Sequence, residues 1–246
     1  MRPFLFLGTR AEDVAADGEY EAVLRYSGLA AASLWRVRLE REPLPRLDLD
    51  GLSGVIVGGG PFNSSDPEDE KSAAQHRVER EMAALLDELV ERDFPFLGAC
   101  YGVGTLGTHQ GGVVDRTYSE PVGPAEIELT AEGAADPLLA GVPARFTAYL
   151  GHKEAVRELP PSATLLARSA DAPVQMFRVG TNLYATQFHP ELDLAGIEQR
   201  VEVYRSHGYF PPEEGERIVA RAREHRVTAP MRILRNFVSR YARPAR

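Results

Sequence analysis

The sequence contains a single cysteine, Cys100, in a setting that suits a catalytic nucleophile. A short apolar run ends in the segment 98–102, which reads Gly-Ala-Cys-Tyr-Gly. The two glycines allow a tight turn between a strand and a helix, and such a turn lifts the side chain between them out of the sheet. A thiol at a helix N-terminus faces the positive end of the helix dipole, so we expect a lowered pKa for Cys100.

A histidine and a carboxylate lie far downstream, in the segment 188–191, which reads Phe-His-Pro-Glu. A lone cysteine with a distant histidine and a nearby carboxylate is a candidate catalytic triad for amide cleavage. In that chemistry Cys100 attacks the carbonyl carbon, and His189 holds the thiol proton and later protonates the leaving amine. Glu191 orients the imidazole through the ring nitrogen that faces away from sulfur. We therefore expect these three side chains to meet in the folded protein.

Amide cleavage also needs backbone N–H groups that stabilise the oxyanion of the tetrahedral intermediate. One expected donor is the N–H of Tyr101, directly after the nucleophile. The other is the N–H of Gly59 or Gly60, in a glycine run that follows an apolar segment. Pro61 has no N–H and cannot contribute. One such donor lowers the barrier by about 3 kcal/mol.

The elements that must position these residues alternate between strands and helices. The sequence predicts strands over residues 3–8, 35–39, 52–57 and 94–98, and helices over 22–34, 71–92 and 231–241. Short β-like runs separated by turn residues follow at 125–129, 145–149, 164–167, 174–178 and 183–186. This pattern predicts an α/β fold with a mostly parallel central sheet, helices on both faces, and the site at the carboxyl ends of the strands.

The length and composition suit one soluble globular domain. We expect a single domain over residues 1–246, in which the charged, helical segment 192–228 is an elaboration near the site. The net charge of -8 argues against a nucleic-acid partner, and no apolar stretch is long enough to span a membrane. One cysteine cannot form an intramolecular disulfide, which favours the cytoplasm. We expect no metal and no cofactor, since helix capping explains the acidic cluster at 66–70.

Three blocks of the sequence together resemble the class I, triad-type glutamine amidotransferases. They are Gly58-Gly59-Gly60-Pro61, the segment 98–102 followed by Gly111-Gly112, and Gln187-Phe188-His189-Pro190-Glu191. A softer block at 151–156 is similar to stand-alone and GMP-synthase-like members. The resemblance implies a flavodoxin-like three-layer sandwich and an enzyme that releases ammonia from glutamine through a cysteine thioester. It also implies a partner, a synthase subunit, to which the ammonia passes.

The chain departs from the family pattern just after the nucleophile. Family members commonly continue Cys-x-Gly-His/Met-Gln, whereas this chain has Gly102, Val103 and Gly104. Gly104 takes the position of a glutamine that helps to shape the substrate pocket in the family. We expect Gly102 and Gly104 to border the substrate. The substrate is therefore free glutamine or, as an alternative, a γ-glutamyl amide or peptide with a larger substituent.

Two further hypotheses compete with hydrolysis. The chain could be a weakly active or non-catalytic subunit that regulates a synthase, because it carries no P-loop and no ATP-pyrophosphatase signature of its own. The glycines at 102, 104 and 107 also match the dinucleotide fingerprint. That fingerprint normally belongs to an early βαβ unit with an acidic residue after the next strand, whereas residues 121–124 have the composition of a loop.

Overall fold

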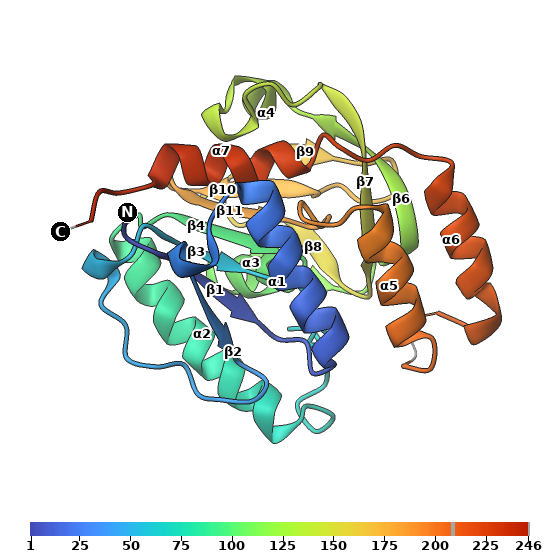
Figure 1. Ribbon diagram of the computed structural model, residues 1–246, viewed down its shortest axis with the longest axis horizontal. Coiled ribbons are helices and arrows are strands. Elements are labelled where there is room, and N and C mark those ends of the chain that lie inside the picture. The colour runs from blue at the N-terminus through green and yellow to red at the C-terminus, as the bar shows by residue number, and fades with distance from the viewer. Residues whose placement is uncertain (208–209, 246) are drawn as a thin grey trace.

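The computed structural model describes residues 1–207 and 210–245, and within them one nine-stranded sheet forms the centre of the fold (Figure 1). In spatial order the strands are β2 (Leu34–Arg38), β1 (Phe4–Gly8), β3 (Gly54–Val57), β4 (Phe96–Ala99), β11 (Leu183–Thr186), β10 (Met176–Val179), β9 (Ala163–Arg168), β6 (Glu120–Leu129) and β7 (Arg145–His152). The strands from β2 to β11 run parallel, and those from β11 to β7 pair in antiparallel fashion.

Helices cover both faces of this sheet (Figure 1). Because successive side chains of a strand point to opposite faces, Leu5 and Leu7 join the core under α2 (Ala73–Glu91) and α3 (Tyr101–His109). Phe4 and Phe6 join the core under α1 (Asp13–Ser27) and α7 (Met231–Tyr241) on the other face. The predicted three-layer, flavodoxin-like α/β sandwich is therefore confirmed.

The first helix differs from the prediction of a helix over residues 22–34. Helix α1 begins at Asp13 and ends at Ser27. Gly28 stops it by adopting a left-handed conformation with φ 78°, from which its N–H caps the carbonyl of Leu24. The prediction for residues 71–92 is confirmed by α2, where Ser72 accepts a hydrogen bond from the N–H of Gln75 and so caps the first turn.

The central β-rich section is confirmed and is more regular than predicted. Each of the five expected runs lies on or overlaps a strand of the antiparallel half. Residues 121–124, expected as a loop, belong to β6, whose pairing with β7 shifts register between Glu120 and Gly123. A separate pair, β5 (Val113–Asp115) with β8 (Ala155–Glu158), was not anticipated. The irregular register explains why proline and glycine are tolerated within β6.

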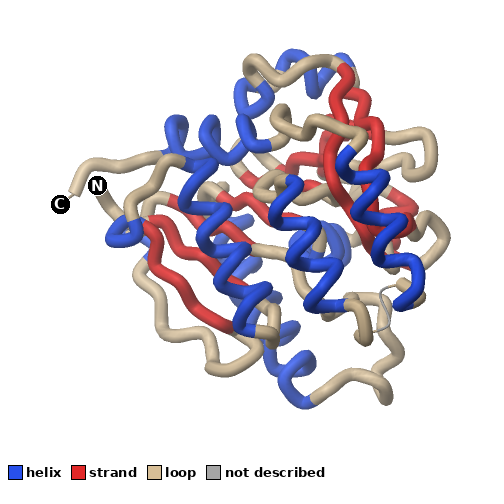
Figure 2. Tube along the Cα trace, turned by 45° about the vertical axis from the view of Figure 1, so that its right-hand side comes forward, coloured by secondary structure: helices blue, strands red, loops and turns tan. Residues whose placement is uncertain are grey.

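The segment 192–228 contains two helices, α5 (Leu194–Tyr204) and α6 (Gly215–Arg223), while its residues 208–209 lie outside the described residues. Figure 2 shows these helices side by side next to the long β6–β7 pair. They share a small apolar cluster with Tyr149 of β7. One continuous sheet joins the two halves of the chain, and α5 also contacts α1 beside the site.

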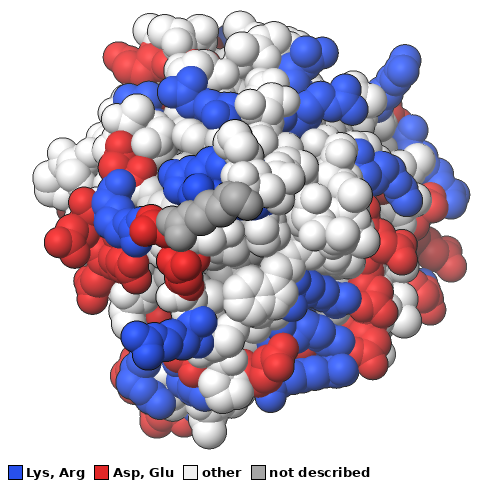
Figure 3. Space-filling model, turned by 60° about the vertical axis from the view of Figure 1, so that its left-hand side comes forward, with Lys and Arg blue, Asp and Glu red and all other residues white. Residues whose placement is uncertain are grey.

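One face of the molecule shows how its charged side chains are distributed. On the face displayed in Figure 3, Lys and Arg side chains are interspersed with Asp and Glu side chains. Among the helices that the structure describes, none combines the length and the apolar character needed to cross a bilayer. The face in view therefore presents charges of both signs.

Candidate active site

Cys100 lies at a strained turn between strand β4 and helix α3. Its backbone has φ 50° and ψ -87°, a conformation that side-chain-bearing residues rarely adopt. The N–H of Cys100 donates to the carbonyl of Thr186 in β11 at 2.7 Å, which fixes the turn to the neighbouring strand. A Cβ on Gly98 would lie 2.8 Å from the Cα of Gly102, so glycine is required where the helix starts. The predicted turn is therefore present, and its geometry is held by the backbone.

His189 and Glu191 follow the end of β11, the parallel neighbour of β4. Parallel strands end at the same edge of the sheet, so the two segments meet beside Cys100. The Nδ1 atom of His189 lies 2.8 Å from Oε1 of Glu191, in a turn in which the N–H of Leu192 donates to the carbonyl of His189. The N–H of His189 itself donates to Tyr149 in β7. Pro190 thus sits in a turn, and the carboxylate reaches the imidazole from its far side.

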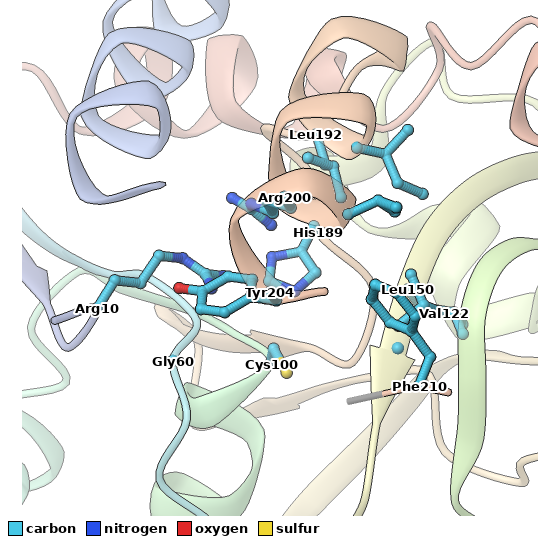
Figure 4. Close-up of a pocket in the computed structure, with 13 residues that line it drawn as sticks. Arg10, Gly60, Cys100, Val122, Leu150, His189, Leu192, Arg200, Tyr204 and Phe210 are labelled. Atoms are coloured by element: carbon cyan, nitrogen blue, oxygen red, sulfur yellow. The ribbon is translucent and has the colours of Figure 1, made fainter. Parts of the chain in front are cut away.

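The imidazole of His189 stands over the thiol of Cys100 (Figure 4). Both side chains also flank Gly59, because a Cβ there would lie 2.4 Å from Cε1 of His189 and 3.3 Å from Cβ of Cys100. Within the described residues no hydrogen bond joins the sulfur to the ring. The three predicted side chains are thus brought together, with the imidazole between the thiol and the carboxylate.

A network of buried charges behind His189 was missed by the sequence analysis. Arg200 of α5 donates to Oε1 of Glu191 at 2.7 Å and to Oε1 of Glu19 at 3.3 Å. Arg10, which follows β1, donates to the same Glu19 oxygen at 3.0 Å. Glu19 and Glu191 are almost fully buried. In the sequence these residues look like the solvated faces of charged helices, so no local signal distinguishes them.

The same acidic side chains raise the question of a metal site. Ligand atoms of Glu19, His189 and Glu191 lie within 4.8 Å of one another. The guanidinium of Arg200 already pairs with both carboxylates and supplies the positive charge that they need. The arrangement therefore fits a salt-bridge network better than a metal centre.

The electrostatics of the site correct one prediction. Burial raises the pKa of the Cys100 thiol to about 12, because it outweighs the lowering influence of Arg10 and Arg200. Burial also lowers the pKa of His189, against the opposing charge of Glu191. Burial disfavours the charge of Glu191, yet His189 and Arg200 hold its pKa well below the usual range. At neutral pH the site therefore holds a thiol, a neutral imidazole and a carboxylate, and the expected lowered thiol pKa is wrong.

The glycine loop after β3 supplies only part of the expected oxyanion site. The N–H of Gly59 donates to Oε1 of Glu19 at 3.2 Å, so its predicted role as an oxyanion donor is wrong in this conformation. Gly60 lines both cavities that meet at Cys100. Tyr101 is the first residue of α3, where the backbone N–H has no partner within the helix. Gly60 and Tyr101 therefore stay the predicted donors.

Two cavities meet at Cys100. The larger, of about 60 Å³, includes His189 and is lined mainly by apolar side chains, among them Val122, Leu150, Val201 and Tyr204 (Figure 4). The smaller, of about 20 Å³, is more polar and lacks the histidine; it is lined by the loop after Gly60 and by residues 151–154. The nucleophile therefore lies between a mainly apolar compartment and a more polar one.

The glycines of α3 have packing roles. Within the described residues neither Gly102 nor Gly104 lines either cavity, so direct contact with substrate, as predicted, is not what the structure provides. Gly102 allows the close crossing with Gly98, and a Cβ on Gly104 would lie 2.3 Å from Oε1 of Glu154. A Cβ on Gly107 would lie 3.0 Å from a methyl group of Val156. Tight packing thus explains why glycines stand at positions 102, 104 and 107, the pattern that resembles a dinucleotide fingerprint.

Residues 20–201 match the family described as "Glutamine amidotransferase class-I". The chain belongs to this family. Among curated relatives, a subunit of the glutamine-hydrolysing GMP synthase of Thermococcus kodakarensis is 30% identical over 185 residues, which cover 74% of this chain and 86% of the relative. The glutamine-hydrolysing GMP synthase of Thermomicrobium roseum is 35% identical over 139 residues, or 56% of this chain. The match spans only 23% of that relative's length, and 31% of the similarly named protein of Aeropyrum pernix.

The solved structures agree with this class I assignment at the level of the fold. The crystal structure of a glutamine amidotransferase from Thermotoga maritima superimposes with a TM-score of 0.78 and covers 98% of both chains at 20% identity. A glutamine amido transferase from Methylobacillus flagellatus gives a TM-score of 0.71 at 17% identity. The expected family and fold are both confirmed, and family membership supports an enzyme that acts on glutamine.

Proposed function

We propose that this class I family member hydrolyses the side-chain amide of glutamine to glutamate and ammonia, with Cys100, His189 and Glu191 as its catalytic residues. The observation that carries the proposal is the arrangement of three side chains at one edge of the sheet, beside the glycine loop. The imidazole of His189 lies between the thiol of Cys100 and the carboxylate of Glu191. Membership of the glutamine amidotransferase family supports the substrate class.

The first half of the reaction forms a thioester. The amide carbonyl carbon binds to the sulfur of Cys100 as the thiol proton moves to Nε2 of His189, the ring nitrogen that does not face Glu191. The negative charge that develops on the amide oxygen is stabilised by the N–H groups of Gly60 and Tyr101. His189 then returns the proton to the amide nitrogen, the carbon–nitrogen bond breaks, and ammonia leaves.

The second half of the reaction hydrolyses the thioester. A water molecule gives a proton to His189 and adds its oxygen to the thioester carbon, and the carbon–sulfur bond then breaks as Cys100 regains a proton. Throughout both halves Glu191 holds the His189 tautomer that has its proton on Nδ1, and it stabilises the imidazolium when that forms. Arg200 keeps Glu191 ionised and in place.

Selective alkylation of the single cysteine tests this proposal. We expect a glutamine-like chloroketone to label Cys100 once per chain and abolish glutamate release, and we expect excess glutamine to slow the labelling. Asparagine, whose side chain is one methylene shorter than that of glutamine, is the control competitor and should slow the labelling much less. Labelling at the same rate with and without glutamine would show that the pocket does not take this substrate.

We also propose that the ammonia is delivered to a synthase partner. Support comes from relatives whose names describe one subunit of a glutamine-hydrolysing GMP synthase. A stoichiometric complex with an ATP-dependent synthase, and faster glutamate release within it, is the expected result. A complex in which Cys100 never reacts with the chloroketone would instead favour the non-catalytic, regulatory role.

A second substrate class remains a candidate because of the larger cavity. This cavity includes His189, which protonates the leaving group, and its walls are mainly apolar. Its volume of about 60 Å³ exceeds the space that one water-sized molecule needs. A γ-glutamyl amide could place a small apolar substituent of its leaving amine against these walls. A panel of these amides, compared with glutamine by kcat/KM, decides between the two substrate classes.

A further inference from the structure

The glycine loop that follows β3 is held from both sides at Gly59. The N–H of Gly59 donates to Oε1 of Glu19, and the carbonyl oxygen of Gly59 accepts a hydrogen bond from Oγ1 of Thr9 at 3.2 Å. Thr9 follows strand β1, the parallel neighbour of β3, and is fully buried. Side chains from the N-terminal part of the chain therefore fix both peptide groups that flank Gly59.

The contact with Thr9 sets the direction of the next backbone donor. The peptide bond between Gly59 and Gly60 is trans, so its carbonyl and its N–H point in opposite directions. The carbonyl faces Thr9, and the N–H of Gly60 therefore points away from Thr9. Among the described residues, Thr9 borders neither of the two cavities that meet at Cys100, whereas Gly60 borders both. Within residues 1–207 and 210–245 this N–H donates to no acceptor, so it can donate to a ligand oxygen.

Close packing ties the hydroxyl group of Thr9 to Gly60. A Cβ on residue 60 would lie 1.8 Å from Oγ1 of Thr9 and 2.9 Å from Cβ of Thr9. A side chain at residue 60 would collide with the hydroxyl group, so glycine lets the loop come close enough for the hydrogen bond. Thr9 and Gly59 are both buried, so water could not replace the donor if the hydroxyl group were removed.

We propose that Thr9 is a positioning residue, whose hydroxyl group holds the Gly59–Gly60 peptide with the N–H of Gly60 directed at the oxyanion. The inference rests on the proposed function, since it concerns the same reaction. The oxyanion develops only after the sulfur of Cys100 attacks, so a correctly placed donor stabilises the transition state and not the bound substrate. Thr9 should therefore affect kcat and leave KM almost unchanged.

The test removes the hydroxyl group of Thr9 while it keeps the shape of the side chain. Thr9→Val should lower kcat for glutamine hydrolysis about 10- to 100-fold and change KM by less than about twofold. Thr9→Ser keeps the hydroxyl group and should return kcat to within about threefold of the unaltered protein. The matched control is Thr130→Val, which removes a hydroxyl group that donates to the carbonyl of Leu165, at the start of α4 (Ala131–Ala135). This control should leave kcat unchanged.

Alkylation of Cys100 by iodoacetamide distinguishes a positioning role from general damage to the site. This displacement occurs at a saturated carbon and forms no oxyanion, so its rate should be the same in Thr9→Val and in the unaltered protein. Faster alkylation of Thr9→Val would mean that Thr9 only keeps the thiol buried, which would overturn the inference. An unchanged kcat in Thr9→Val, or a loss of kcat that Thr9→Ser shares, would also overturn it.

Glutamate release by the unaltered protein tests the proposed function separately. If no glutamate is released, the proposed function fails, and NMR then measures the orientation of the peptide group directly. The carbonyl carbon resonance of Gly59 and the amide nitrogen resonance of Gly60 should both shift in Thr9→Val and return in Thr9→Ser. Resonances that are the same in the two variants would refute the role of Thr9, whether or not the protein hydrolyses glutamine.

Discussion

The two halves of the site are held in place by different forces. Cys100 is fixed by the backbone: a strained turn, a crossing of two glycines, and a hydrogen bond to Thr186. His189 is fixed by side-chain charges, since Glu191 behind it pairs with Arg200 from a distant helix. The nucleophile is thus positioned by covalent geometry and close packing, and the base by electrostatics.

This difference determines what each half tolerates. A backbone-held residue keeps its position when charges change, but it fails when a glycine that packs against the turn gains a side chain. A charge-held residue depends on every member of its network, because a buried charge that loses its partner is strongly destabilising. The two halves should therefore respond to different substitutions.

Removal of the nucleophile has the largest expected effect. Cys100→Ala should lower kcat for glutamine hydrolysis by about 10⁴-fold or more, because no thioester can form. The unfolding midpoint in urea should change little, since the turn is held by backbone contacts. Glutamate release measured by an enzyme-coupled assay checks the rate. Residual turnover above about one per cent would assign the nucleophile elsewhere.

Loss of Arg200 from the buried charge network should have the second-largest effect. Arg200→Met leaves Glu19 and Glu191 buried beside each other, so we expect a loss of about 3–5 kcal/mol in the free energy of unfolding and a lower kcat. The matched control is Arg223→Met, which removes an exposed pair with Glu198 and should cost less than about 1 kcal/mol. Urea denaturation measures both. Equal losses in the two variants would contradict a charge-held base.

The pH dependence of Cys100 alkylation tests whether nearby charges stabilise the thiolate. Because burial raises the pKa of Cys100 to about 12, the thiolate fraction should grow about tenfold per pH unit from pH 7 upwards. The rate of alkylation by iodoacetamide should therefore rise about 100-fold between pH 7 and pH 9, without levelling off. A plateau below about pH 8 would indicate a thiolate stabilised by nearby charges.

A methyl group at the glycine crossing has the smallest expected effect. Gly98→Ala places a Cβ 2.8 Å from Cα of Gly102, so β4 and α3 must move apart, at a cost of about 1–3 kcal/mol in the free energy of unfolding. The control, Gly51→Ala, meets nothing closer than 3.6 Å and should be nearly neutral. Thermal unfolding of both variants measures the difference. A neutral Gly98→Ala would mean that the turn is not held by this crossing.

Much of the fold and part of the site could be predicted because they depend on local patterns. Apolar runs, helical periodicity and turn residues describe conformations that form over a few neighbouring residues, so the layers and the strand-to-helix turn were predicted correctly. The catalytic roles of His189 and Glu191 stay predictions. The start of α1 was missed because its first turns carry few apolar residues in the sequence.

Only the tertiary structure decided the surroundings of these residues. Glu19 and Arg200 look like solvent-facing charges in the sequence, and only the packing of α1 and α5 buries them against Glu191. Glu19 of α1 also engages the N–H of Gly59, and burial of the thiol reverses the expected pKa shift of Cys100. Desolvation and charge pairing depend on distances between segments far apart in the chain, and no local pattern encodes those distances.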